Sequence, residues 1–181
     1  MIPSAYIQAW RASAPWPDTG QVEQDLIICR ALCDLFNAPV LKGRIAFRGG
    51  TAINKLLFRQ PLRYSEDIDL VQTRPEPIGA TVDAIRDTLS WLGKCRRDQA
   101  GHSMHMVFKF TPEADTQTTL KIKVEINTRE HACSLGVRPY PFRSGKRLVP
   151  GQCRDRVLRA GGDLRNKTAG PAAAEQESRS L

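Results

Sequence analysis

Residues 45–57 change from the pattern of a strand to that of a helix at a pair of glycines. The apolar segment at residues 45–47 is typical of a short buried strand, and the apolar residues at positions 53, 56 and 57 have helical spacing. Gly49 and Gly50 lie between the two, where glycine permits a tight turn and a close approach to the backbone. This strand–turn–helix unit predicts that strands and helices pack together.

Other segments extend the alternation of helices and strands. Apolar residues at positions 22, 26, 29, 33 and 36 predict one amphipathic helix, and those at 78, 82, 85, 89 and 92 predict another that stops at Gly93. Residues 65–71 alternate as a strand does. Two alternating runs, residues 104–110 and 122–126, predict antiparallel neighbours joined by a turn over residues 111–118. We therefore predict an α+β (α/β) fold with a small mixed β-sheet and flanking helices.

The composition fits a single compact domain. The chain has 181 residues, enough to bury a sizeable core, and its apolar content of 41% excludes a disordered or fibrous chain. We find no apolar run long enough to cross a membrane and no secretion signal at the start. The five cysteines are odd in number and scattered, which is typical of free thiols. We expect a cytoplasmic protein without a membrane partner.

The positive charge of the chain is unevenly distributed. With 27 basic and 19 acidic residues the formal charge is +8, which suggests a nucleic-acid partner. Residues 143–181 alone hold nine basic and four acidic side chains and contribute +5, whereas residues 1–142 contribute +3. The charge therefore says little about the partner of the main domain.

Two polar features lie next to the strand–turn–helix unit. The glycine turn before a helix could hold a phosphate, because helix N-termini attract anions, although such glycines are more often a simple turn. Asp67 and Asp69 are two residues apart on a predicted strand, so their carboxylates project from one face about 7 Å apart. Carboxylate oxygens suit Mg²⁺ or Mn²⁺. The alternative, a solvated strand face, is weakened because Ile68 and Leu70 face the opposite side.

The last predicted strand carries a third polar face. Lys121, Lys123 and Glu125 alternate with apolar residues, so Glu125 could add a third carboxylate and the lysines could bind nucleotide phosphates. An exposed edge strand would have the same pattern. The histidines at positions 102, 105 and 131 have no matching cysteine spacing, and we expect surface or strand positions for them rather than a metal site.

Three segments in this order resemble one family. They are residues 47–52 (FRGGTA), residues 63–70 (RYSEDIDL) and residues 123–127 (KVEIN). Together they resemble the AbiEii/AbiGii nucleotidyltransferase toxins, minimal relatives of the DNA polymerase β-type nucleotidyltransferases, over about residues 6–142. The resemblance implies the nucleotidyltransferase fold and a toxin of a toxin–antitoxin or abortive-infection system. Such a toxin would transfer NMP from an NTP to an RNA acceptor, with tRNA as the first candidate. It would use Mg²⁺ (or Mn²⁺) as cofactor and would have a cognate antitoxin as its protein partner.

The resemblance also implies roles for the residues of these segments. Catalysis and metal binding would belong to Asp67, Asp69 and Glu125, and nucleotide binding to Gly49, Gly50, Thr51, Arg63, Ser65 and Lys123. Two alternatives remain open. The chain could be a truncated, non-catalytic remnant that binds nucleotide, RNA or antitoxin, or it could nucleotidylate a protein or a small molecule.

After Phe142 the sequence no longer resembles the family. The resemblance implies a C-terminal helical half with a further catalytic Lys and Asp, and that half is missing, which leaves the activity of this chain open. Residues 159–181, back-translated and read in another frame, allow ELEEICATKLRALLQRNKSRDL, which carries the missing motif. We predict a lead-in over residues 1–20, a catalytic domain over residues 21–142 and a frameshifted, poorly ordered basic tail over residues 143–181. The alternative is a genuine RNA-binding tail.

Overall fold

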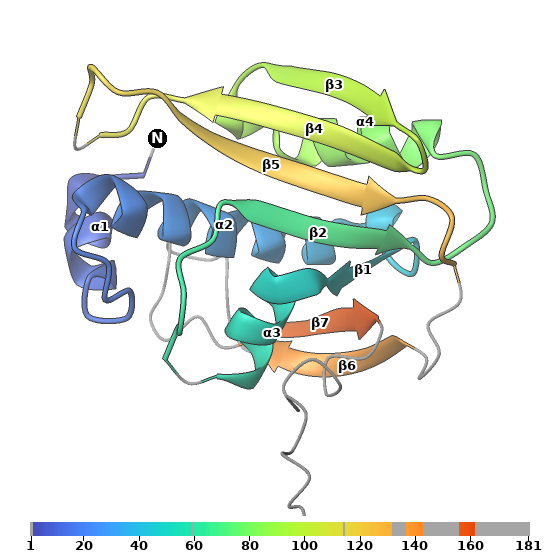
Figure 1. The fold of residues 1–181 in the computed structure, drawn as a ribbon, viewed down its shortest axis with the longest axis horizontal. Coiled ribbons are helices and arrows are strands. Elements are labelled where there is room, and N and C mark those ends of the chain that lie inside the picture. The colour runs from blue at the N-terminus through green and yellow to red at the C-terminus, as the bar shows by residue number, and fades with distance from the viewer. Residues whose placement is uncertain (1, 59, 114, 132–136, 143–155, 162–181) are drawn as a thin grey trace, which may run out of the picture.

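The computed structural model describes residues 2–58, 60–113, 115–131, 137–142 and 156–161, which form a mixed sheet with helices packed on it (Figure 1). The helices are α1 (Ser4–Trp10), α2 (Thr19–Asn37), α3 (Gly49–Leu57) and α4 (Gly79–Thr88), with short 3₁₀ turns at Pro39–Leu41 and Ser90–Leu92. The strands are β1 (Ile45–Arg48), β2 (Asp67–Gln72), β3 (Cys95–Ala100), β4 (Ser103–Phe110), β5 (Leu120–Asn127), β6 (Val137–Phe142) and β7 (Arg156–Gly161). The predicted mixed sheet with flanking helices is confirmed.

The described strands form one seven-stranded sheet in the order β3-β4-β5-β2-β1-β7-β6. β4 and β5 are antiparallel neighbours, as their alternating sequences predicted. β2 runs antiparallel to β1 and parallel to β5, in a register that places Asp69 between Arg48 and Glu125. This pairing brings the glycine turn that follows β1 next to the acidic strand β2 and the polar face of β5.

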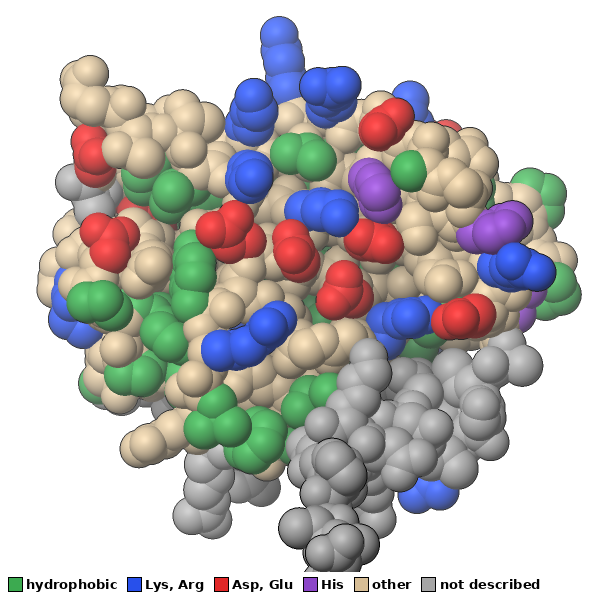
Figure 2. Space-filling model, in the orientation of Figure 1, with side chains coloured by type: hydrophobic (Ala, Val, Ile, Leu, Met, Phe, Trp, Pro, Cys, Tyr) green, Lys and Arg blue, Asp and Glu red, His purple; other side chains and the backbone are tan. Residues whose placement is uncertain are grey.

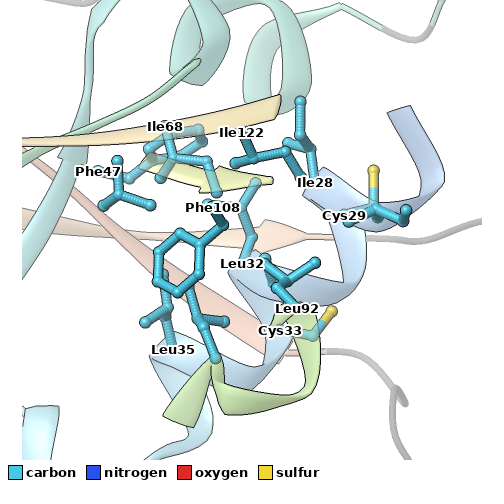
Figure 3. Packing of buried hydrophobic residues seen from close by; sticks show 14 of the residues in the cluster. Ile28, Cys29, Leu32, Cys33, Leu35, Phe47, Ile68, Leu92, Phe108 and Ile122 are labelled. Carbon is cyan, nitrogen blue, oxygen red and sulfur yellow. The ribbon is translucent and has the colours of Figure 1, made fainter. Parts of the chain in front are cut away.

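One face of the sheet is covered by helices. Asp18 begins α2 by accepting a hydrogen bond from the backbone N–H of Gln21 at 3.0 Å, and the helix then runs behind β2 in the view of Figure 1. In Figure 3 the side chains of α2 point toward those of the strands, among them Phe47, Ile68 and Phe108, which are fully buried. Because side chains alternate along a strand, the neighbours of these core residues point to the opposite face of the sheet. That face carries the acidic residues of β2.

The lead-in packs against the same core. Ile7 and Trp10 of α1 are buried, and the Trp10 indole donates a hydrogen bond to Asp25 of α2 at 2.9 Å. α2 begins at Thr19, so the expected boundary between residues 20 and 21 falls inside this helix.

Of residues 143–181, the structure describes only β7. This strand pairs in parallel with β1 and antiparallel with β6. Residues 156–161 of the predicted tail thus form a strand, because the free edge of β1 offers backbone hydrogen bonds to a further strand. The other residues of the predicted tail lie outside the described residues.

The cysteines only partly follow the prediction. Cys29 and Cys95 carry free thiols. Cys33 is disulfide-bonded, which corrects the prediction of a free thiol at that position. Of the helices that the structure describes, none has the length and apolar character needed to cross a bilayer.

Candidate active site

The start of α3 lies directly against the acidic strand. Gly49 has φ +78°, a left-handed conformation that favours glycine. A Cβ at this position would lie 2.1 Å from Oδ2 of Asp69, so the carboxylate occupies the space that a side chain would need. The glycine is thus required both by the turn and by the close approach of Asp69.

The next two residues of the turn contact the segment that leads into β2. A Cβ on Gly50 would lie 2.8 Å from Nη2 of Arg63, so the guanidinium group lies against the first turn of α3. The hydroxyl groups of Thr51 and Ser65 share a hydrogen bond. The structure therefore brings together the turn and the Arg63–Ser65 pair, which the sequence predicted as one nucleotide-binding group.

Asn54 of α3 holds this segment in place. Its Nδ2 donates to the backbone carbonyl of Arg63 at 2.8 Å, and its Oδ1 accepts from the backbone N–H of Leu62 at 2.8 Å. The side chain is buried. Sequence reasoning missed this residue, although a polar side chain on the inner face of a short amphipathic helix was a usable signal.

The N-terminus of α3 has features that suit an anion. The side chain of the N-cap residue, Arg48, accepts no capping hydrogen bond from the first backbone N–H groups of the helix. These groups and the helix dipole favour negative charge. With the Arg63 guanidinium beside Gly50, the turn offers the donors that a phosphate group requires.

Glu125 lies opposite Asp69 in the parallel pairing of β2 and β5, and Lys123 lies opposite Asp67. The ammonium group of Lys123 donates to Oε2 of Glu125 at 2.8 Å, and this hydrogen bond holds the pKa of Glu125 below its usual range. Nε2 of His105 is 3.4 Å from the same oxygen. Sequence reasoning missed His105, because only the register of β4 on β5 reveals that it faces Glu125.

Negative charge accumulates around Asp69. Burial raises the pKa of Asp69, the carboxylates of Asp67 and Glu125 raise it further, and Arg48 and Lys123 only partly oppose them. A cation between the carboxylates would relieve this repulsion, and a donor set of carboxylate oxygens suits Mg²⁺ or Mn²⁺. The aspartate pair fits such an ion.

In this conformation the Glu125 carboxylate does not join the aspartate pair in a three-carboxylate cluster. Within the described part of the chain, no three or more His, Cys, Asp or Glu side chains gather closely enough to hold a metal ion. The Glu125 carboxylate is bonded to Lys123 instead. To join the aspartate pair on a metal it would have to exchange this bond for the ion.

Two other polar groups of this region bond to partners outside the site. Arg48 forms an ion pair with Glu130 at 2.6 Å. Nδ1 of His131 is 3.2 Å from the backbone carbonyl of Gln72, at the far end of β2 from the aspartates.

The sequence matches a model of the family described as "Nucleotidyl transferase AbiEii toxin, Type IV TA system" over residues 30–156, which is more than half of the chain. The match begins later than expected from the motifs and continues beyond Phe142, where the resemblance was predicted to end. Among curated proteins, no sequence matches the chain significantly.

Solved structures with similar folds include three from two bacteria. JHP933 from Helicobacter pylori is 13% identical, with a TM-score of 0.53 over 80% of this chain and 53% of its own. A putative nucleotidyltransferase from H. pylori is 12% identical, with a TM-score of 0.52 over 80% and 54%. MenT4, a nucleotidyltransferase toxin from Mycobacterium tuberculosis H37Rv, is 13% identical, with a TM-score of 0.55 over 86% and 54%. At this identity they show a shared fold, and the chain spans about half the length of each.

Proposed function

We propose that this chain, which belongs to the AbiEii family of nucleotidyltransferase toxins, transfers a nucleoside monophosphate from an NTP to an RNA acceptor, with tRNA as the first candidate. A divalent cation, Mg²⁺ or Mn²⁺, is the proposed cofactor. The type IV toxin–antitoxin designation of the family supports an antitoxin as protein partner. The cytoplasm is the proposed location, because RNA and NTP are both found there.

One observation carries this proposal: the Asp69 carboxylate lies against Gly49 at the first turn of α3, and helix N-termini favour phosphate groups. A metal held by Asp67 and Asp69 would therefore be next to the phosphates of a nucleotide bound at the Gly49–Thr51 turn. Arg63 and Ser65, which contact Gly50 and Thr51, would bind or orient the same phosphates. Chemistry at a nucleotide phosphate needs these parts in contact.

The reaction is a displacement at the α-phosphorus of the NTP. A ribose hydroxyl oxygen of the acceptor forms a bond to the α-phosphorus, the bond to the bridging β-phosphate oxygen breaks, and pyrophosphate leaves. The hydroxyl proton leaves toward the Glu125 carboxylate, and Lys123, released from Glu125, neutralises phosphate charge. A bound divalent cation would stabilise the negative charge that develops on the phosphoryl oxygens.

The proposal is tested by incubating the full chain with an α-phosphate-labelled NTP, Mg²⁺ and total tRNA. We expect labelled RNA, and we expect Asp69→Asn to lower the transfer rate by at least about 100-fold because the change removes a metal ligand's charge at constant size. The matched control is Asp87→Asn, which alters an exposed carboxylate on α4, a helix on the other face of the sheet.

The outcomes separate the three candidate functions. Label on RNA that depends on Asp69 supports the proposal. NTP binding without transfer to any acceptor would identify a non-catalytic remnant. Label found only on protein or on a small molecule would replace the RNA acceptor with that substrate.

A further inference from the structure

The sheet face that carries the aspartate pair continues into a basic surface on β3, β4 and β5. Figure 2 views this face and shows acidic side chains near its middle, with lysine, arginine and histidine side chains beside them. The strand pairings place four cations on it, Arg96, Lys109, Lys121 and Lys123, and Lys94, just before β3, lines the same surface. We call this set the open-face cations.

The register shows why these cations share one face. Arg96 lies opposite Val107, Lys109 opposite Lys121, and Val107 opposite Lys123. The residues between them in β4 and β5, such as Phe108 and Ile122, are buried against the helices on the other side. Because neighbouring strands are about 5 Å apart, the cations form a surface several strands wide rather than one isolated charge.

This surface is hollowed. A depression of about 470 Å³ is lined by Lys94, just before β3, and by residues of β3, β4 and β5, namely Cys95, Arg96, Asp98, His105, Val107, Lys109 and Lys123. It reaches the candidate active site at its inner edge, because Lys123 lines it and also bonds to Glu125. His105, also in the lining, approaches the same carboxylate.

The position of the hollow distinguishes two kinds of phosphate ligand. The nucleotide phosphates belong to the turn at the start of α3, which lies on the β1 side of the aspartate pair. The hollow lies on the opposite side, across β5. A chain of phosphates bound in it would therefore lead toward the aspartates from the side not taken by the NTP, as the attacking partner of an in-line displacement must.

We infer that the hollow on β3, β4 and β5 binds the phosphate backbone of the RNA acceptor and directs its reacting end to Asp67 and Asp69. This inference rests on the proposed function for the identity of the acceptor. The open-face cations supply the charge complementarity that phosphate contacts require. An acidic protein partner is the weaker match, because the lining contains no Trp, Tyr or Phe to anchor a protein interface. The same lack leaves the phosphate backbone of RNA, rather than stacked bases, as the group that is bound.

Paired double variants of the full chain test the inference. Arg96→Gln/Lys109→Gln removes two open-face cations. Arg86→Gln/Arg97→Gln makes the same change in charge on side chains directed to the helical side, where both contact Asp83. Affinity is measured by fluorescence anisotropy with a 5′-labelled single-stranded RNA of about 10 nucleotides at several salt concentrations. Thermal unfolding of both variants confirms that they are folded.

Each phosphate contact to a single strand contributes about 0.7 to the slope of log affinity against log salt, so loss of two contacts makes the slope shallower by about 1.4. The corresponding loss of affinity at 0.1 M salt is about 25-fold. We expect this loss for Arg96→Gln/Lys109→Gln and a slope close to wild type for Arg86→Gln/Arg97→Gln. Equal slopes and affinities in the two double variants would overturn the inference.

A second readout keeps the inference separate from the proposed function. Binding of a fluorescent NTP with Mg²⁺ is measured for the same proteins, and we expect Arg96→Gln/Lys109→Gln to bind it as the wild type does. If RNA affinity depends on the open face but no label is transferred, the binding surface stands and the proposed transfer fails. If transfer occurs and the Arg96→Gln/Lys109→Gln variant binds RNA as tightly as the wild type does, the inference fails and the proposed function stands.

Discussion

Gly49 is the residue on which the geometry of the site depends most directly. Its positive φ and the Asp69 carboxylate beside its Cα impose two separate demands, and both exclude a side chain. A turn alone would require only the first. The second ties the backbone of the proposed phosphate site to the proposed metal ligand, so a change at Gly49 should affect metal and nucleotide together.

We predict that Gly49→Ala abolishes label transfer and lowers the free energy of unfolding by at least about 1–2 kcal/mol, the cost of a left-handed alanine. The added methyl group must also displace Asp69. The control is Gly79→Ala at the start of α4, where no atom lies within 4 Å of the added Cβ. Denaturant titration and the transfer assay measure both variants. A Gly49→Ala protein as stable and active as Gly79→Ala would contradict this account.

Sequence reasoning could propose the candidate residues of the turn and of β2 because glycine, aspartate and strand alternation each have a local signature. It missed Asn54 and His105, because the partners of both side chains depend on which segments meet. Asn54 bonds to a loop that follows its own helix, and His105 faces Glu125 only in the observed register of β4 and β5. A shift of one residue in that register would point His105 to the core.

At the level of elements, α3 is fixed to α2 by a buried ion pair. Nζ of Lys55 lies 2.5 Å from Oδ1 of Asp25, with side chains only 9% and 4% exposed. The other oxygen of Asp25 accepts the hydrogen bond from Trp10. One carboxylate therefore joins α1, α2 and α3, and it holds the helix whose first turn forms the candidate phosphate site.

We predict that Lys55→Met lowers the free energy of unfolding by about 3–5 kcal/mol, because it leaves the buried charge of Asp25 without its cation. The matched control is Arg86→Met, which breaks exposed ion pairs on α4 and should barely move the denaturation midpoint. Urea titrations compare the two proteins. Equal midpoints would show that the Lys55–Asp25 pair does not stabilise the fold.

The elements with strong periodicity were predictable, and those without it were not. The helix that became α2 and the hairpin of β4 and β5 follow from their apolar spacing. β3 was missed because its sequence, CRRDQA, contains no apolar alternation. It forms a strand because it pairs along the free edge of β4, an interaction that depends on tertiary structure rather than on local sequence.

At the scale of the whole chain, the sequence spans about half the length of each of the three solved structures described above. We propose that the reading frame has changed downstream of codon 142 and that the family's further Lys and Asp are encoded in the alternative frame. The family match extends to residue 156, and β7 (Arg156–Gly161) pairs with the sheet. Part of the segment after Phe142 therefore still resembles the family or packs in the fold.

Sequencing the gene tests this proposal. We expect an uninterrupted alternative frame beyond codon 142 that encodes the Lys- and Asp-containing motif. Stop codons in that frame, or an unrelated sequence, would contradict it. If the motif is present, restoring the frame should raise the transfer rate of the encoded protein above that of the present chain.

The most direct test of the central claim, transfer of the α-phosphoryl group of an NTP to RNA at the aspartate pair, compares two labels in parallel reactions. With Mg²⁺ and tRNA, we predict that label in the α-phosphate of the NTP is found on the RNA. Label in the γ-phosphate should be released as pyrophosphate and never be found on the RNA, and Asp69→Asn should prevent both transfer and release. Label from the γ-phosphate on the RNA, or α-label that persists in Asp69→Asn, would contradict the account.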